Sequence, residues 1–171
     1  MPRCYTALMR ALGIDCGGTY TGFGVVEQTP EGVLVCIAAG AIRLKTRDPL
    51  CVRLLRVYEE LQAVIQRHQP EVVAIEDIFY AANVKSALKL GEVRGVAMLT
   101  AAACGLPVVG YAPLSVKSAV VGYGRAEKSQ VQDMVTRLLK LPAPPQPADA
   151  ADALAVAICH LHTAATLAAM K

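Results

Sequence analysis

Three short apolar segments open the chain, and the links between them are too short to hold a helix. We predict strands at residues 11–15, 21–28 and 33–44, with a turn signal from Thr29 to Gly32 between the last two. Strands joined so closely pair antiparallel, because a parallel connection needs a long crossover. The beginning of the chain therefore predicts an antiparallel meander.

The rest of the chain alternates helical patterns with short apolar runs. Apolar residues recur every three or four positions from Leu50 to Ile65, which is the spacing of one helix face. Later helices are expected at 83–103, with Asn83 as N-cap and Gly105 as stop, and at 115–121, 128–139 and 148–169; strands are expected at 72–75 and 107–111. We expect an α/β fold with a five-stranded mixed sheet, three antiparallel strands and then two parallel ones, flanked by helices.

Length and composition indicate one domain with a substantial core. The chain has 171 residues, of which 54% are hydrophobic and 18% charged. We expect a single domain over residues 1–171, with 1–10 as a loose N-terminal extension and Met9 as an alternative start. The net charge of +3 permits nucleic-acid binding without requiring it, so a basic surface would have to come from clustering.

Cysteine spacing and the apolar tail bear on where the protein works. No two of the six cysteines are spaced as CxxC, so zinc and redox motifs are disfavoured and a reducing cytoplasm is favoured. No signal-peptide core opens the chain. The Ala-rich segment 148–170 is interrupted by Asp149 and Asp152, which favours a packed helix over a membrane span.

Two acids follow predicted strands. Asp15 comes just after an apolar strand segment, and Glu76 comes directly after the run at 72–75. Ligand sites of open α/β sheets form at the carboxyl ends of strands. If these two strands are parallel neighbours, their acids lie side by side.

Two further acids lie on the last helix. Asp149 and Asp152 share one helix face because they are three residues apart, and their neighbours are almost all apolar. Buried unpaired acids are costly, and a divalent cation removes that cost. Four carboxylates suit Mg²⁺ or Mn²⁺ better than zinc and support two-metal phosphodiester hydrolysis. The plain alternative is that Asp149 is a helix cap and the strand-end acids are turn residues.

Four stretches resemble the RuvC family of bacterial Holliday-junction resolvases. They begin at Leu12, Ala74, Val116 and Ala148 and read LGIDCGGTYTGFGVV, AIEDIFYAANVKSALKLGEVRG, VKSAVVGYGRAEKSQVQDMVTRLLKLP and ADAADALAVAICH. They span almost the whole chain in the family's order, and the long middle ones are the most specific.

The resemblance implies a ribonuclease-H-like fold and a homodimer that makes paired symmetric nicks in four-way junctions during recombination and DNA repair. It implies that the catalytic and metal-binding acids, with two Mg²⁺ ions per subunit, are Asp15, Glu76, Asp149 and Asp152. It further implies basic active-site residues at Lys117 and Lys128, a junction-probing aromatic at Phe79, and RuvA and RuvB as partners.

The chain departs from the family pattern at two positions beside these acids. Cys16 stands where the family usually has Pro, and Asp77 stands where Gln or Glu is expected. Neither change removes a catalytic acid. We expect Cys16 to loosen a rigid turn and Asp77 to add negative charge near the DNA.

Several other residues are candidates for contact with DNA or with a second subunit. Tyr80 could share the role of Phe79, while Lys85, Lys89 and Arg94 could line the DNA track; Arg125 and Arg137 are weaker candidates, and His160 and His162 are expected only to pack. The helix at 83–103 is apolar on most sides, which predicts that a partner subunit covers one of them.

Three rival functions fit parts of the pattern. The segment from Asp15 to Gly22 resembles the phosphate loop of actin-like sugar kinases, but those need a second domain that 171 residues do not supply. A YqgF-like nuclease acting on RNA would share the fold, and substrate preference would separate the two. A catalytically inactive binding module is disfavoured because all four acids are present.

Overall fold

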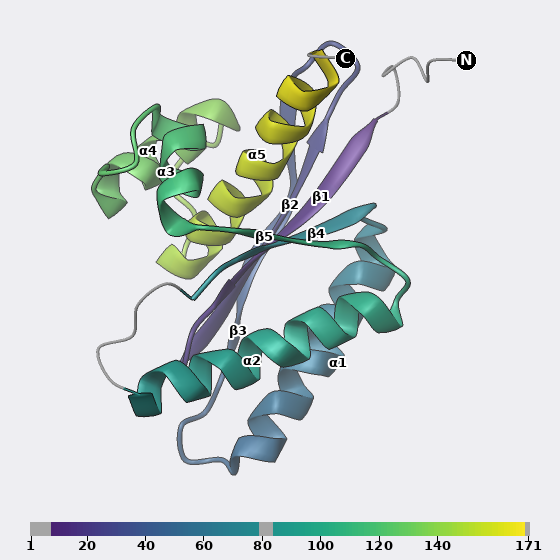
Figure 1. Ribbon diagram of the computed structural model, residues 1–171, viewed down its shortest axis with the longest axis vertical. Helices are drawn as coiled ribbons and strands as arrows, with labels where there is room; N and C mark the ends of the chain where they lie inside the picture. The colour runs from purple at the N-terminus through teal and green to yellow at the C-terminus, as the bar shows by residue number, and fades with distance from the viewer. Residues whose placement is uncertain (1–7, 79–83, 170–171) are drawn as a thin grey trace.

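A computed structural model describes residues 8–78 and 84–169, and its elements alternate as the sequence predicts. The strands are β1 (Met9–Cys16), β2 (Tyr20–Gln28), β3 (Leu34–Arg43), β4 (Val72–Glu76) and β5 (Val108–Tyr111). The helices are α1 (Leu50–His68), α2 (Val84–Ala103), α3 (Pro113–Val121), α4 (Lys128–Leu138) and α5 (Ala148–Ala169). Figure 1 shows α3, α4 and α5 on one face of the sheet and α1 and α2 on the other.

The sheet order is β3-β2-β1-β4-β5, which confirms the predicted five-stranded mixed sheet. β1, β2 and β3 pair antiparallel, whereas β1 with β4 and β4 with β5 pair parallel. The central strand is therefore β1. Its parallel register with β4 sets Ile14 beside Ile75, so the residues that follow them emerge next to each other at one edge of the sheet.

Helix ends differ from the sequence prediction by a residue or two. α3 begins at Pro113, because proline is well suited to the first helical position, where its missing N–H is not needed.

α5 begins at Ala148, so Asp149 lies inside the first turn. The alternative that Asp149 is a simple helix cap is therefore wrong. The predicted N-cap of α2, Asn83, lies outside the described residues.

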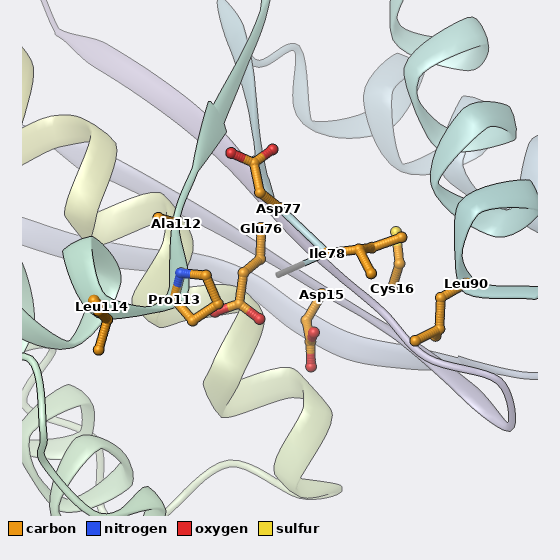
Figure 2. Close-up of a pocket in the computed structure, with 9 residues that line it drawn as sticks. All are labelled: Asp15, Cys16, Glu76, Asp77, Ile78, Leu90, Ala112, Pro113 and Leu114. Carbon is orange, nitrogen blue, oxygen red and sulfur yellow. The ribbon is translucent and has the colours of Figure 1, made fainter. Parts of the chain in front are cut away.

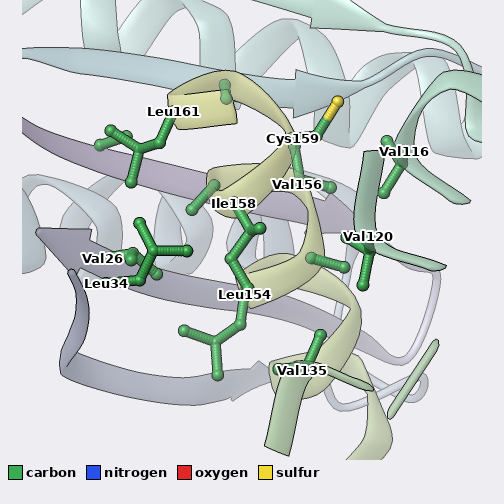
Figure 3. Packing of buried hydrophobic residues seen from close by; sticks show 14 of the residues in the cluster. Val26, Leu34, Val116, Val120, Val135, Leu154, Val156, Ile158, Cys159 and Leu161 are labelled. Carbon is green, nitrogen blue, oxygen red and sulfur yellow. The ribbon is translucent and has the colours of Figure 1, made fainter. Parts of the chain in front are cut away.

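α5 lies at the centre of the larger core. Leu154, Ile158 and Leu161 are fully buried in one cluster with Val26 of β2 and Leu34 of β3 (Figure 3). Val116 and Val120 of α3 belong to the same cluster and cover the helix from another side. α5 is long and apolar enough to cross a membrane by composition alone, but 61% of that window is buried inside the protein, as in a core helix.

Two glycines let α5 approach the sheet at backbone distance. A Cβ added at Gly13 of β1 would lie 2.0 Å from the carbonyl oxygen of Ala153, and one at Gly22 of β2 would lie 2.0 Å from that of Asp149. No side chain larger than hydrogen fits at either position without movement of the helix. These glycines therefore set how close the first turns of α5 come to the ends of β1 and β2.

The opposite face of the sheet is covered by α1 and α2. Val57, Leu61 and Ile65 are the buried residues of α1, in the spacing that the sequence predicts. α2 buries only Val93, Ala97, Thr100 and Ala101. Several of its large apolar side chains stay exposed, namely Val84, Leu88, Met98 and Leu99.

Candidate active site

Asp15 and Glu76 stand side by side at the carboxyl ends of two neighbouring parallel strands. Each directly follows one of the paired residues of β1 and β4. Both side chains are half-buried and line the same two hollows. The sequence prediction that these acids lie together at one sheet edge is confirmed in geometry.

The first turns of α5 bring the second pair of acids to the same edge. Asp152 lines a hollow of about 210 Å³ together with Asp15 and Glu76. Asp149 lies one turn earlier, where its Oδ1 would be 3.7 Å from a Cβ placed at Gly17 in the β1–β2 turn. The shared face predicted for Asp149 and Asp152 thus points toward the strand ends.

Two lysines from the neighbouring helices complete this hollow. Lys128, the first residue of α4, places its Nζ 2.6 Å from Oδ2 of Asp152. Lys117 of α3 lines the same hollow and is half-buried. The structure thus brings both predicted active-site lysines to the hollow that Asp15, Glu76 and Asp152 line.

Crowding of the acids changes their protonation. Burial, reinforced by the charges of Asp152, Glu76 and Asp149, raises the pKa of Asp15 to about 7. The pKa of Glu76 is raised by burial and by Asp152, although both lysines oppose the shift. The pKa of Asp152 is raised mainly by burial, with Lys128 opposing it. The site therefore holds more negative charge than its surroundings stabilise.

The donor set fits a hard divalent cation in its chemistry. Carboxylate oxygens are the ligands that Mg²⁺ and Mn²⁺ prefer, and a cation would offset the burial and the repulsion that raise these pKa values. In the described residues, no group of three or more His, Cys, Asp or Glu side chains is gathered tightly enough to hold a metal ion. The ammonium of Lys128 instead neutralises Asp152.

A larger, mostly apolar hollow of about 410 Å³ adjoins Asp15 and Glu76 on their other side. Its apolar wall comes from the ends of β1 and β4, from α2 and from the start of α3, and consists of Cys16, Ile78, Leu90, Ala112, Pro113 and Leu114 (Figure 2). The two acids therefore separate a charged hollow with lysines from an apolar one. The sequence analysis did not anticipate this second hollow.

Asp77 is held away from the other acids. Figure 2 shows its carboxylate pointing away from those of Asp15 and Glu76. Its Oδ1 accepts a hydrogen bond of 2.6 Å from the guanidinium of Arg94, whose Nε also donates to the Glu76 carbonyl oxygen. The added charge of Asp77 is therefore paired within the protein, and Arg94 ties α2 to the end of β4.

Cys16, the second departure, forms part of the apolar wall. Burial and the neighbouring Asp15 raise the pKa of its thiol to about 12, so the thiol is protonated near neutral pH. A protonated thiol is a poor nucleophile. The five described cysteines are all free.

The predicted DNA-contacting residues are distributed unevenly. Phe79 and Tyr80 lie outside the described residues. Lys85 and Lys89 are exposed in the first turns of α2, the helix whose Leu90 lines the apolar hollow with Asp15 and Glu76. Arg94 is engaged by Asp77, so its contact with DNA stays a prediction.

Sequence reasoning missed the residues that position the site. Gly13 and Gly22 interrupt apolar strands, and a glycine inside a strand pattern signals close approach of another backbone. That signal was present in the sequence. Nothing in the spacing of Asp77 and Arg94 pointed to their pairing, because they are 17 positions apart, one just after β4 and the other within α2.

Comparison with known proteins gives one consistent answer. A family model described as crossover junction endodeoxyribonuclease RuvC matches residues 11–160. The protein of that name from Koribacter versatilis is 67% identical to this chain, and the match covers 95% of this chain and 98% of the relative. The protein of that name from Acidobacterium capsulatum is 55% identical, and the match covers 95% of this chain and 99% of the relative. The structure resembles Thermus thermophilus RuvC in complex with a Holliday junction substrate, with a TM-score of 0.88 and 33% identity over 94% of this chain and 97% of that one.

Proposed function

Because the chain belongs to the crossover junction endodeoxyribonuclease RuvC family, we propose that Asp15, Glu76, Asp149 and Asp152 are the acids with which it nicks Holliday junctions. The family is one of divalent-metal-dependent nucleases of DNA recombination and repair, and its ribonuclease-H-like fold is the fold of this chain. A sugar-kinase role for the Asp15–Gly22 turn is thereby set aside.

One observation carries the assignment of the acids. Two strand ends and one helix bring carboxylates from three distant parts of the chain around a single hollow. Burial, reinforced by the repulsion between these acids, raises the pKa of Asp15 to about 7, a cost that folding alone would not favour. Such an arrangement is typical of a functional site.

We assign the four acids as ligands of two Mg²⁺ ions per subunit, with Mn²⁺ as a substitute; bound cations of this kind activate a water molecule and stabilise the leaving oxygen. Lys117 and Lys128 line the hollow with these acids and would bind the phosphate that is cut. For that contact, Lys128 exchanges Asp152 for a phosphate oxygen. Asp15 and Glu76 orient the reacting groups from rigid strand ends.

The exposed apolar surface of α2 supports the proposal of a homodimer. Val84, Leu88 and Leu99 are exposed by 76%, 63% and 62%. Gly91 and Gly95 lie between them on the helix, and an added Cβ at either would meet nothing within 4 Å. A second α2 could approach closely there and cover the apolar side chains, giving two active sites for two strands.

The remaining assignments, which concern base contacts, partner proteins and the compartment, rest on the resemblance to the RuvC family. Phe79 and Tyr80 would stack with bases at the crossover, since they follow β4 close to Glu76 in the chain. RuvA and RuvB would deliver the junction, and the cytoplasm is the compartment in which this happens.

Cleavage assays test the assignment of the acids. Wild-type protein is incubated with a synthetic four-way junction, a linear duplex and an RNA–DNA hybrid, each with and without Mg²⁺. We expect paired nicks in the junction alone, and only with Mg²⁺. Asp15→Asn should abolish cleavage while junction binding stays measurable, and Asp133→Asn, a change on the exposed surface of α4, serves as the matched control. Full cleavage by Asp15→Asn would overturn the metal assignment, and preference for the hybrid would favour an RNA-directed nuclease.

A further inference from the structure

The strongest concentration of positive charge lies away from the acids, in the segment that joins β3 to α1. Residues 43–56 carry five cations, Arg43, Lys45, Arg47, Arg53 and Arg56, against one anion, Asp48. This basic segment has a net charge of +4, whereas the whole chain carries +3, so the remaining residues carry a net −1. The mildly basic composition thus comes from one place.

The charge of the basic segment is not neutralised within the protein. In the part of the chain that the structure describes, none of its five cations forms an ion pair. Arg43, Lys45, Arg47 and Arg56 are exposed, and Lys45, Arg53 and Arg56 line a shallow hollow of about 250 Å³ with Asp48. Unpaired cations around a concave surface attract a polyanion.

The basic segment is fixed in place and does not trail from the fold. Leu44 is almost fully buried, and its N–H donates to the carbonyl oxygen of Thr19. The N–H of Asp48 donates to the carbonyl oxygen of Lys45 across a turn, and a guanidinium nitrogen of Arg56 lies 3.4 Å from the carbonyl oxygen of Arg43. The cations are therefore presented from an ordered surface.

Topology places the basic segment at the same edge of the sheet as the acids. β3 runs parallel to β1, because each pairs antiparallel with β2. The carboxyl end of β3 therefore lies at the edge where Asp15 and Glu76 emerge. Figure 1 shows the β3–α1 connection at the end of the molecule where α2 begins, and the first turns of α2 carry the exposed Lys85 and Lys89.

We propose that the basic segment binds the sugar–phosphate backbone of a duplex arm of the junction, at a distance from the phosphate that is cut. This inference rests on the proposed function and deepens it. Contacts to backbone phosphates position a protein on DNA without reading sequence. The segment therefore contributes affinity and the direction in which an arm leaves the active site, not the choice of cleavage sequence.

The test is the salt dependence of junction binding, measured without Mg²⁺ so that no DNA is cut. The triple variant Arg43→Gln, Lys45→Gln, Arg47→Gln removes three exposed charges outside the helices. For each phosphate that is no longer neutralised, the slope of log K against log salt should become shallower by about 0.9, and affinity at low salt should fall by about tenfold or more. The matched single-charge pair is Arg47→Gln and Arg67→Gln, since Arg67 is exposed at the opposite end of α1.

Shortening the junction arms locates the bound phosphates. With long arms, wild type should bind more tightly than the triple variant. As the arms are trimmed, the difference should disappear because the DNA no longer reaches the segment. Cleavage of bound junction at saturating protein should stay within about twofold of wild type, since the segment holds an arm and not the reacting phosphate.

The outcomes separate this inference from the proposed function. If wild type neither binds nor cuts a junction, the proposed function fails. If wild type does both and Arg47→Gln has the same salt slope as Arg67→Gln, the basic segment is only a solvated surface and the inference is overturned. Circular dichroism checks the folding of the triple variant, and the single variants decide the question if the triple one does not fold.

Discussion

α5 and α2 are both long apolar helices, one on each face of the sheet, yet they are covered very differently. Between Ala150 and Leu161 of α5, every residue except Asp152 is buried. Of the 20 residues in α2, four are buried. α5 is enclosed by the sheet, α3 and α4, whereas α2 packs mainly against α1 and the sheet (Figure 1).

This difference in burial suggests that α5 and α2, on opposite faces of the sheet, have different roles. Full enclosure holds α5 rigidly, and a rigid helix can keep acids at a defined distance from strand ends. Incomplete enclosure leaves α2 with apolar surface that water contacts, and surface of this kind indicates association. We therefore expect substitutions on α5 to damage chemistry and stability, and substitutions on α2 to damage assembly.

The largest effect, on the rate of cleavage, is expected from Asp152, which is the half-buried residue in the otherwise buried part of α5. Asp152→Asn should lower the rate of junction cleavage by about 10²–10³-fold or more, as for loss of a preorganised electrostatic group. The measurement is the single-turnover rate at saturating protein. Asp133→Asn on α4 is the control and should cleave at the wild-type rate; equal rates for the two variants would remove Asp152 from the site.

The next largest effect compares glycines under the two helices. Gly13→Ala should destabilise the protein by about 3 kcal/mol, because the added Cβ meets the backbone of α5 and overpacking of this kind is costly. Gly95→Ala on α2 should stabilise it by up to about 1 kcal/mol, since alanine favours the helix and nothing lies within 4 Å. Denaturant unfolding at low protein concentration measures both. If both substitutions changed the free energy of unfolding in the same direction, the proposed difference in packing between α5 and α2 would be contradicted.

A moderate effect is expected at the exposed face of α2. Leu88→Glu should weaken the dimer by about 2 kcal/mol, roughly thirtyfold in Kd, as for loss of an interface anchor. Analytical ultracentrifugation over a concentration series measures the change. Val33→Glu, which places the same charge on another exposed apolar residue, should leave the dimer intact. A wild-type protein that is monomeric at micromolar concentration would refute the dimer itself.

The smallest effect concerns a titrating group within α5. Burial lowers the pKa of His160, so its folded pKa lies below the unfolded value of 6.5. Its contribution to stability is therefore fully present above pH 6.5 and is lost as pH falls through the folded pKa. The free energy of unfolding should decline on acidification in this window, and His160→Gln should flatten that part of the profile. A profile unchanged by the substitution would show that His160 does not titrate on unfolding.

Much of this architecture was predictable from local patterns. The strand and helix boundaries came from apolar spacing, and the pairing of Asp15 with Glu76 came from placing both at strand ends. The role of α5 was predicted only in part, because two acids on an apolar helix signal a site without indicating what the helix packs against. Long-range pairs such as Asp77 with Arg94, and the placement of the basic segment at the same edge of the sheet as the acids, depend on the folded topology.

The position of α5 in the chain has a consequence for synthesis. α5 packs on β1, the first strand, although more than 130 residues of chain separate Cys16 from Asp149. A ribosome releases the sheet-forming segments well before it releases the helix that covers them, and contacts so distant in sequence form late. Asp149 and Asp152 arrive with that helix. A nascent chain therefore lacks two of its four acids until the helix that completes the larger core has also been made.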